Sequence, residues 1–282
     1  MSLDHGHSHR QQSGQDGPRT AGLCYPPWHW LRHGDPRQVL EAHAQQQSKA
    51  YSRLKNQFIR ELLGDLSGKS LLDYGCGPGQ FLAYAAGAGA RRIVGVDSQA
   101  TALAAAALLL RGLRPEVERL LVCSRDLSFS AVASFDVILL KDVIEHLPDD
   151  LTLLQGAARC LHPQGRLVIS TQNAWSLNYL IEGFAQRRLR GRRHWMGWDP
   201  THLRFYTPPG LASLLARAGL EAVDWRSSYL VPHKLPRGKG RYLRLEFLTG
   251  LDRLLGWRQP LHRLGWCLMV SARPCRRGGP RS

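Results

Sequence analysis

From residue 70 onward, short apolar runs alternate along the chain with longer stretches of helical periodicity. The apolar runs lie near residues 70–74, 92–97, 117–123, 135–141 and 166–171, and the helical stretches lie near 79–88, 98–111 and 149–161. Short apolar runs between turn residues are typical of buried strands. Their alternation with helices predicts an α/β fold, in which helices cover both faces of a mostly parallel sheet.

The chain on either side of this alternation is also patterned. Gln38–Leu63 has apolar residues along one side of a single predicted helix. Beyond the fifth strand, the predicted elements are a helix at Pro208–Ala218, a strand near 220–228 and a last strand at Trp266–Ala272 that pairs with it. We therefore expect a disordered or loosely packed tail at residues 1–35 and one α/β domain at residues 36–282.

Two segments do not fit the minimal alternation of strands and helices. Residues 173–206 carry an apolar helical stretch that leads into a run of arginines, and tryptophans flank this combination. It fits a lid over a substrate pocket, an interfacial helix that contacts a membrane, or a solvated helix at the sheet edge. The basic segment 231–265 fits either an extension of the acceptor site or a dimer contact.

The composition narrows the class of protein. No apolar run among the 282 residues approaches the roughly 20 needed to span a bilayer, and the first residues lack the apolar core of a secretory signal. The six cysteines contain no C-x-x-C pair, which favours reduced thiols in a cytoplasmic protein. The net charge of +16 is typical of proteins that bind nucleic acid or an anionic membrane surface. A bias toward arginine codons in a GC-rich genome explains the charge equally well.

The most informative local feature is the turn after the first predicted strand, where Asp73 precedes Gly75, Gly77 and Gly79. Glycines let the backbone adopt positive φ and approach a ligand, and the helix that follows offers unpaired N–H groups. Such a turn is typical of a nucleotide-type cofactor site at the carboxyl edge of a parallel sheet. The dinucleotide fingerprint is excluded because Gln80 stands where its third glycine would be, and no P-loop lysine follows.

The pattern Asp-x-Gly-x-Gly-x-Gly resembles motif I of the class I S-adenosylmethionine-dependent methyltransferases. Asp97 ends the second strand roughly 20 residues later, where an acid accepts the ribose hydroxyls of an adenosine. The resemblance implies that Asp126 meets the adenine amino group, that Leu127 lies on the ring and that Lys141 ends the fourth strand at the cofactor. It also implies a Rossmann-like sheet of seven strands with the last one antiparallel. The aromatic patch Pro26–Trp30 is expected to pack over the cofactor mouth.

The fourth strand leads into Glu145-His146-Leu147-Pro148, which resembles the Glu-His element of the O-methyltransferases of ubiquinone biosynthesis. In that family two acids and the histidine of this element hold a divalent ion, and the matching positions here are Asp142, Glu145 and His146. Asp142 replaces the usual glutamate and reaches less far, so no metal is assigned. Glu145 and His146 are expected to act as a base or to orient the acceptor. The alternative is that Glu145 and His146 form a loop and helix cap near the cofactor and take no part in the reaction.

A third candidate catalytic residue, His202, lies in Thr201-His202-Leu203-Arg204-Phe205-Tyr206-Thr207. This element resembles one found in many bacterial methyltransferases that act on quinone, lipid or sugar acceptors. His202 and Arg204 are expected to close the acceptor side of the site. A structural turn before a helix is the competing interpretation.

These features predict a methyltransferase that uses S-adenosyl-L-methionine for O-methylation of a small-molecule, quinone-like, lipid or sugar acceptor. RNA or protein methylation, and a non-catalytic scaffold that binds the cofactor, are the alternatives. The chain lacks the Asn/Asp-Pro-Pro-Tyr/Phe element that nucleic-acid N-methyltransferases use to hold a flat amine, which disfavours nucleic acid. Any membrane contact is expected to be peripheral and to involve the arginine-rich lid. The sequence leaves the oligomeric state open.

Overall fold

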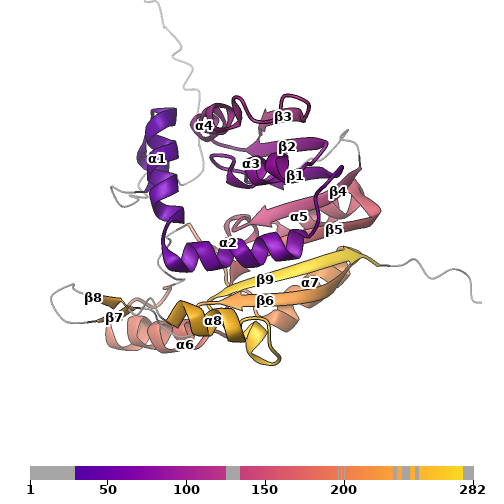
Figure 1. The fold of residues 1–282 in the computed structure, drawn as a ribbon. Coiled ribbons are helices and arrows are strands. Elements are labelled where there is room, and N and C mark those ends of the chain that lie inside the picture. Colours follow the sequence, from indigo (N-terminus) through magenta and orange to yellow (C-terminus); the bar gives the residue numbers. More distant parts are fainter. Residues whose placement is uncertain are drawn as a thin grey trace, which may run out of the picture.

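The computed structural model describes residues 29–124, 134–195, 197, 199, 201–230, 234–236, 242–244 and 248–275 (Figure 1). They form a seven-stranded sheet with the strand order β3-β2-β1-β4-β5-β9-β6. Its strands are β1 (Ser70–Tyr74), β2 (Arg92–Asp97), β3 (Glu118–Cys123), β4 (Phe135–Lys141), β5 (Leu161–Gln172), β6 (Leu220–Ser228) and β9 (Cys267–Pro274). Strands β1 to β5 pair in parallel, whereas β9 runs antiparallel to both β5 and β6. The predicted Rossmann-like sheet with an antiparallel last strand is confirmed.

Helices cover both faces of the sheet. On one face, α2 (Ala50–Leu63), α3 (Gln80–Gly87) and α4 (Ala100–Leu110) share a buried cluster with Leu71 and Leu139. On the other face, α5 (Asp150–Cys160) and α7 (Pro208–Arg217) share a cluster with Leu72 and Ile138. Successive strand residues point to opposite faces. A strand covered on both sides must therefore be apolar at nearly every position, which explains the continuous apolar runs.

The prediction of one helix over Gln38–Leu63 was wrong. The structure has α1 (Pro36–Gln47) and α2, separated at Lys49, whose ψ of 141° is extended. The break lets the two helices lie in different directions (Figure 1). Helix α2 crosses β5, β9 and β6, whereas α1 packs beside α4. The chain that precedes α1 forms a short 3-10 turn, η1 (Trp30–Arg32), and residues 1–28 of the predicted tail lie outside the described residues.

The segment predicted as a lid begins and ends at one point of the fold, because Asn173 and Tyr206 form an isolated parallel bridge. Between them lie α6 (Leu177–Phe184) and a π-helical turn, η3 (Ala185–Leu189). Figure 1 shows α6 at the end of the molecule farthest from β3. The segment thus leaves the fold and rejoins it at neighbouring positions beside the end of β5.

The basic segment between β6 and β9 contains a hairpin of β7 (Lys234–Pro236) and β8 (Tyr242–Arg244), then α8 (Leu248–Leu255) and a 3-10 turn, η4 (Leu261–Arg263). The buried Asp252 of α8 accepts hydrogen bonds from the backbone N–H groups of Tyr229 and Leu230, at 2.7 and 2.9 Å. These bonds tie α8 to the end of β6. Among the described helices, none has both the length and the apolar character to cross a bilayer.

Candidate active site

The glycine turn follows β1 and has the backbone geometry that the sequence predicts. The φ angles of Gly75, Gly77 and Gly79 are 78°, 51° and 83°, a region that L side chains rarely adopt. At Gly79, a Cβ atom would also lie 2.8 Å from the Cβ of Ala106 on α4. Glycine is therefore required there both by the turn and by the close packing of α3 on α4.

Asp97 lies beside the glycine turn, although the two are separated by a whole helix in sequence. β2 pairs with β1 and ends at Asp97. The Asp97 carboxylate accepts hydrogen bonds from the backbone N–H of Gly77 at 2.8 Å and of Gln99 at 2.9 Å. Burial raises the pKa of Asp97, and these backbone donors oppose that shift. The structure thus brings together the turn and the acid that were predicted to bind the cofactor.

Asp73 is the penultimate residue of β1 and Lys141 is the last residue of the neighbouring β4, so both lie at the same edge of the sheet. Asp73 is 2% exposed, and burial raises its pKa to about 7, with Lys141 opposing the rise and Asp97 adding to it. Burial also lowers the pKa of Lys141, although two carboxylates favour its charged form. Asp126 and Leu127, predicted to contact adenine, lie outside the described residues.

Trp30 covers the glycine turn from the N-terminal side, and His43 packs against Trp30. The Trp30 ring lies 3.7 Å from the point where a Cβ of Gly77 would be, and it meets the His43 ring edge-on. Burial, followed by the charge of Lys141, lowers the pKa of His43 to about 3, so its ring is neutral. The position of Trp30 agrees with the predicted aromatic cover, whereas sequence reasoning did not single out His43.

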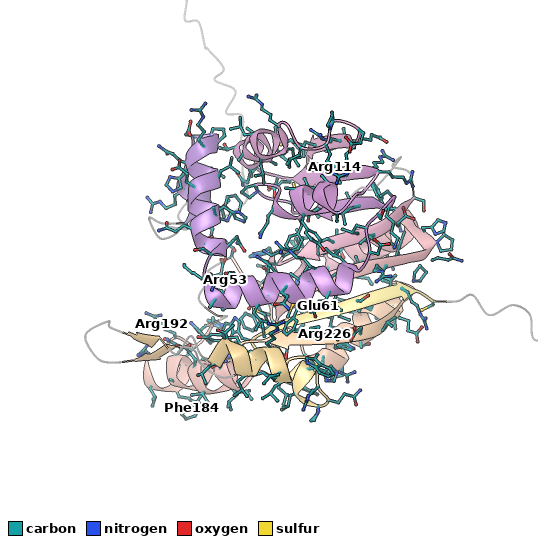
Figure 2. The ribbon with its side chains drawn as sticks, viewed as in Figure 1. Arg53, Glu61, Arg114, Phe184, Arg192 and Arg226 are labelled. Carbon is teal, nitrogen blue, oxygen red and sulfur yellow. The ribbon has the colours of Figure 1, made fainter. Side chains whose placement is uncertain are left out.

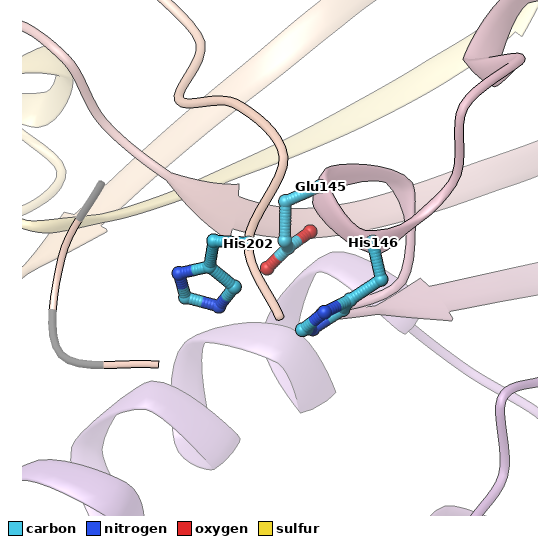
Figure 3. A group of neighbouring side chains, drawn as sticks. All are labelled: Glu145, His146 and His202. Carbon is cyan, nitrogen blue, oxygen red and sulfur yellow. The ribbon is translucent and has the colours of Figure 1, made fainter. Parts of the chain in front are cut away.

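Glu145, His146 and His202 form a compact group (Figure 3). Glu145 and His146 lie on a 3-10 turn, η2 (Ile144–His146), after β4, and His202 lies on the segment before α7. One potential ligand atom from each of the three lies within 4.8 Å of the others. The Leu203 N–H donates to the Glu145 carbonyl at 2.8 Å, which joins the two segments. The three predicted catalytic residues therefore converge.

The environment of Glu145 is unusual for a carboxyl group. The residue is fully buried, and its Oε2 accepts a hydrogen bond from the Thr171 hydroxyl at 2.9 Å. Its Oε1 is buried without a hydrogen-bond partner among the described residues. Burial and the nearby charge of Asp142 raise the pKa of Glu145 to about 8. A buried acceptor without a donor is costly, and such groups are often explained by a function.

His146 and His202 differ in their hydrogen-bond partners and in their electrostatic environment. Burial and the neighbouring His146 lower the pKa of His202 to about 4, so its ring is neutral near pH 7, and its Nδ1 is buried without a hydrogen-bond partner among the described residues. His146 Nδ1 lies 2.9 Å from the Thr201 hydroxyl, which itself donates to Asp199. A hydroxyl has one hydrogen, so the network assigns the imidazole proton to Nδ1 of His146. Its Nε2 therefore has a free lone pair.

Lys55 was missed in the sequence, where it reads as a surface residue of a helix. Its side chain is 9% exposed, and its Nζ contacts both carboxylate oxygens of Asp142. The Ser170 hydroxyl donates to the same carboxylate at 3.0 Å, and Lys141 Nζ lies 3.7 Å away. Although burial acts to raise it, these cations hold the pKa of Asp142 below its usual value. Asp142 also has a positive φ of 55°, a strained conformation for this residue.

Two sequence-based expectations about this region change. Asp142 was matched with Glu145 and His146 as a ligand set, but the group that the described residues bring together contains His202 instead. Arg204 was expected to close the acceptor side, but its guanidinium bonds to the Asp150 carboxylate at 2.7 Å and to a backbone carbonyl. Arg204 therefore anchors this segment to the start of α5.

Aromatic rings pack against one another beside His202. The ring of Phe205 lies 5.7 Å from that of His202, 4.4 Å from that of Tyr179 and 5.5 Å from that of Trp266, between ring centroids. The Tyr179 ring stacks on Trp195 at 5.7 Å. We call Tyr179, Trp195, Phe205 and Trp266 the aromatic cluster. It places flat apolar surface next to the predicted catalytic group.

A family model described as a methyltransferase domain matches residues 43–224, more than half of the chain. The chain belongs to this methyltransferase family. The methyltransferase is 30% identical over 170 residues to the ubiquinone biosynthesis O-methyltransferase of Idiomarina loihiensis, covering 59% of this chain and 67% of that protein. It is 30% identical over 213 residues to the protein of the same name from Cereibacter sphaeroides, covering 72% of this chain and 81% of that protein.

Solved structures resemble the methyltransferase in fold. An S-adenosylmethionine-dependent methyltransferase from Mesorhizobium loti gives a TM-score of 0.51 at 19% identity and covers 80% of this chain and 98% of that one. The magnesium protoporphyrin IX methyltransferase of Synechocystis, solved with bound S-adenosylhomocysteine, gives a TM-score of 0.51 at 15% identity. The match covers 79% of this chain and 84% of that one. The predicted class, an S-adenosylmethionine-dependent methyltransferase, is confirmed by the family match and these likenesses taken together.

Proposed function

We propose that this methyltransferase transfers the methyl group of S-adenosylmethionine to a hydroxyl oxygen of a small, quinone-like acceptor. The observation that carries the proposal is the convergence of Glu145, His146 and His202 at the sheet edge that carries the glycine turn. The aromatic cluster beside His202 suits a flat ring. The names of the relatives, which are ubiquinone biosynthesis O-methyltransferases, support an oxygen acceptor of this kind.

The cofactor is proposed to bind along the carboxyl ends of β1, β2 and β4. The positive φ angles of Gly75, Gly77 and Gly79 let the backbone of the turn approach the ligand closely, and the Asp97 carboxylate accepts the ribose hydroxyls. Asp73 and Lys141 flank the remaining part of the cofactor. Asp126 and Leu127 are proposed to contact the adenine ring, as the family resemblance implies.

Methyl transfer from a sulfonium is an in-line displacement with a good leaving group, so the protein mainly supplies alignment. A hydroxyl acceptor must also lose its proton, and Nε2 of His146 has the free lone pair to take it. The Thr201 hydroxyl and the Asp199 carboxylate then stabilise the charged imidazole. The acceptor oxygen attacks the methyl carbon, and the sulfur retains the electron pair of the broken bond.

The test is formation of S-adenosylhomocysteine with an alkyl-substituted catechol as the acceptor, and mass spectrometry of the methylated product. His146→Ala and His202→Ala are expected to bind the cofactor normally in calorimetry, and at least one of them to lose more than about tenfold in turnover. His162→Ala, which changes an exposed histidine of β5, is the matched control. Full turnover in both site variants would remove these residues from the mechanism, and methylation of RNA or protein in place of the catechol would contradict the acceptor class.

We further propose that the lid segment contacts an anionic membrane surface. Leu177, Leu180, Ile181 and Phe184 are 52–62% exposed, and their spacing places them on one face of α6, which we call the lid face. Figure 2 shows Phe184 on the outer side of the molecule, away from the sheet. Exposed arginines follow directly, namely Arg188, Arg190, Arg192 and Arg193. Apolar side chains beside cations suit insertion among anionic headgroups and give a lipid-like acceptor a route to the site.

Co-sedimentation with vesicles tests this contact. The methyltransferase is expected to sediment with phosphatidylglycerol vesicles and much less with phosphatidylcholine vesicles. Leu180→Glu should reduce sedimentation, whereas Leu120→Glu, at a 43% exposed leucine of β3, should not. Equal sedimentation of both variants would contradict a contact through the lid face, and binding to RNA in its place would assign the positive charge to nucleic acid.

A further inference from the structure

We infer that Arg187 binds an anionic group of the acceptor, a carboxylate or a phosphate, beside the Tyr179 ring of the aromatic cluster. The inference specifies the acceptor class more closely and therefore rests on the proposed function. The binding of the anion does not depend on methyl transfer and can be measured without it. The site does not include the exposed arginines of the membrane contact described above.

Arg187 differs from the other arginines of the lid segment in its burial and in its contacts. It is half-buried, whereas the next four arginines of the segment are exposed. Its Cζ lies 4.9 Å from the centroid of the Tyr179 ring, which is a cation–π contact. A guanidinium that lies over a ring keeps the N–H groups along its edge, and these can bind an oxoanion.

Gly183, one helical turn before Arg187, provides the space for this contact. A Cβ atom at Gly183 would lie 2.9 Å from a guanidinium nitrogen of Arg187 and 3.5 Å from the Trp195 ring. Glycine otherwise disfavours the interior of a helix. The missing Cβ lets the guanidinium lie against α6, beside the Tyr179 ring.

The positive charge of Arg187 has no partner in the described part of the chain. Its guanidinium makes neither an ion pair nor a hydrogen bond with any described residue. The surrounding residues 183–198 include five arginines and no acid. A half-buried cation without a partner favours an anionic ligand, and a guanidinium can bind a carboxylate or a phosphate through two parallel hydrogen bonds.

The turn that carries Arg187 has further unused hydrogen-bonding capacity. Gln186 is fully buried, and neither its amide nitrogen nor its amide oxygen has a hydrogen-bond partner among the described residues. Both residues lie on η3, and π-helical turns occur frequently at functional sites. A buried amide without partners is costly, so this turn has the character of a binding element.

The aromatic cluster connects Arg187 with the predicted catalytic group. Tyr179 lies 4.4 Å from Phe205, and Phe205 lies 5.7 Å from His202, between ring centroids. An acceptor ring that packs on this cluster with its hydroxyl at His146 directs a charged side chain toward Arg187. The anion takes no part in the methyl transfer, so Arg187 determines specificity by binding and orienting the acceptor.

The experiment compares two acceptors with the same catechol ring, dihydrocaffeate and its uncharged methyl ester. The intact protein is expected to favour the acid by at least about tenfold in kcat/KM, mainly through a lower KM, because hydrogen bonds to a charged group are stronger than neutral ones. Arg187→Met should bring the ratio of acid to ester close to one. Arg217→Met, which changes an exposed arginine of α7, should leave the ratio unchanged. A third acceptor with a phosphate in place of the carboxylate identifies the preferred anion, and a preference for either anion over the ester supports the inference.

Gly183→Ala separates the position of the guanidinium from the total charge of the segment. This variant keeps every arginine, but its Cβ displaces the Arg187 guanidinium. It should lower the ratio of acid to ester and melt at no lower temperature than the intact protein, because alanine suits a helix better than glycine. A ratio that stays unchanged in both Arg187→Met and Gly183→Ala would overturn the assignment.

The inference and the proposed function can fail separately. Equal kcat/KM for the acid and the ester in the intact protein would refute the anion site and leave the proposed function intact. If neither is methylated, the proposed function fails, and calorimetry of dihydrocaffeate with the protein loaded with S-adenosylhomocysteine decides the anion site. Tighter binding by the intact protein than by Arg187→Met would support the site, and equal binding would refute it. Loss of vesicle sedimentation in Arg187→Met with an unchanged ratio of acid to ester would assign Arg187 to the membrane surface instead.

Discussion

Replacing Lys55 with methionine tests the buried ion pair that shapes this site. Methionine keeps most of the side-chain volume but removes the charge that compensates Asp142. The side chains of Lys55 and Asp142 are 9% and 27% exposed, so the pair is mostly shielded from solvent. Removal of one partner of a buried pair typically costs about 3–5 kcal/mol. Asp142 retains the Ser170 hydroxyl and Lys141, so the expected loss lies near the lower limit, about 3 kcal/mol.

For a chain of this size, a loss of about 3 kcal/mol corresponds to a melting temperature lower by about 6–12 °C. Thermal unfolding followed by circular dichroism measures this change. Lys55→Met/Asp142→Asn is the control, because it removes the unpaired charge and should recover much of the loss. A single variant that melts within about 2 °C of the intact protein would refute the reasoning, since the pair would then contribute almost nothing.

Three other predictions follow from the fold and the cofactor site. Asp97→Ala should weaken S-adenosylmethionine binding in calorimetry, and an unchanged affinity would discredit the ribose role. Gly79→Ala should lower the melting temperature, because its Cβ would lie 2.8 Å from that of Ala106 at a φ of 83°, and a stable, fully active variant would contradict this. The Asp136 carboxylate accepts hydrogen bonds from the backbone N–H and the hydroxyl of Ser70, and these bonds lower its pKa below the unfolded-state value of 3.8. Its ionised form therefore stabilises the folded state at pH values above 3.8. This contribution is lost as the pH falls through the folded-state pKa. Asp136→Asn should therefore destabilise the protein by about 1 kcal/mol at pH 7 and by less near pH 3 in denaturant unfolding, and a pH-independent difference would contradict this.

The sheet could be predicted from the sequence because its strands are covered on both faces. Each strand then appears as an apolar run, and the runs at β1, β2 and β4 match the structure at both ends. β5 was placed at 166–171 but begins at Leu161, because His162, Pro163 and Gln164 are exposed and do not continue the apolar run. The predictable part of a strand is thus its buried part.

The break between α1 and α2 could not be predicted in the same way. The periodicity of Gln38–Leu63 is helical on both sides of Lys49, and the residues at the break include neither proline nor glycine. What separates the helices is tertiary packing, since α2 lies on β5, β9 and β6 whereas α1 packs beside α4. The pattern of apolar residues along one helix does not record which partner it meets.

In the candidate site too, some residues could be predicted from local sequence and one could not. Glu145, His146 and His202 were identified from short local elements, and the structure brings them together. Lys55 was missed because a lysine on a helix is normally solvated, and its burial against Asp142 depends on a contact across 87 positions of sequence. Residues that act through long-range partners leave no local signal.

The place of β9 in the sheet has a consequence for synthesis on the ribosome. β9 lies between β5 and β6, yet it is translated after both of them and after the 38 residues that separate it from β6. Until Cys267–Pro274 emerges, a nascent chain holds β5 with an open edge and β6 without any neighbour in the sheet. The unfinished product is thus exposed to wrong pairing with other strands throughout this interval, and holding chaperones have their greatest opportunity to act on this protein then.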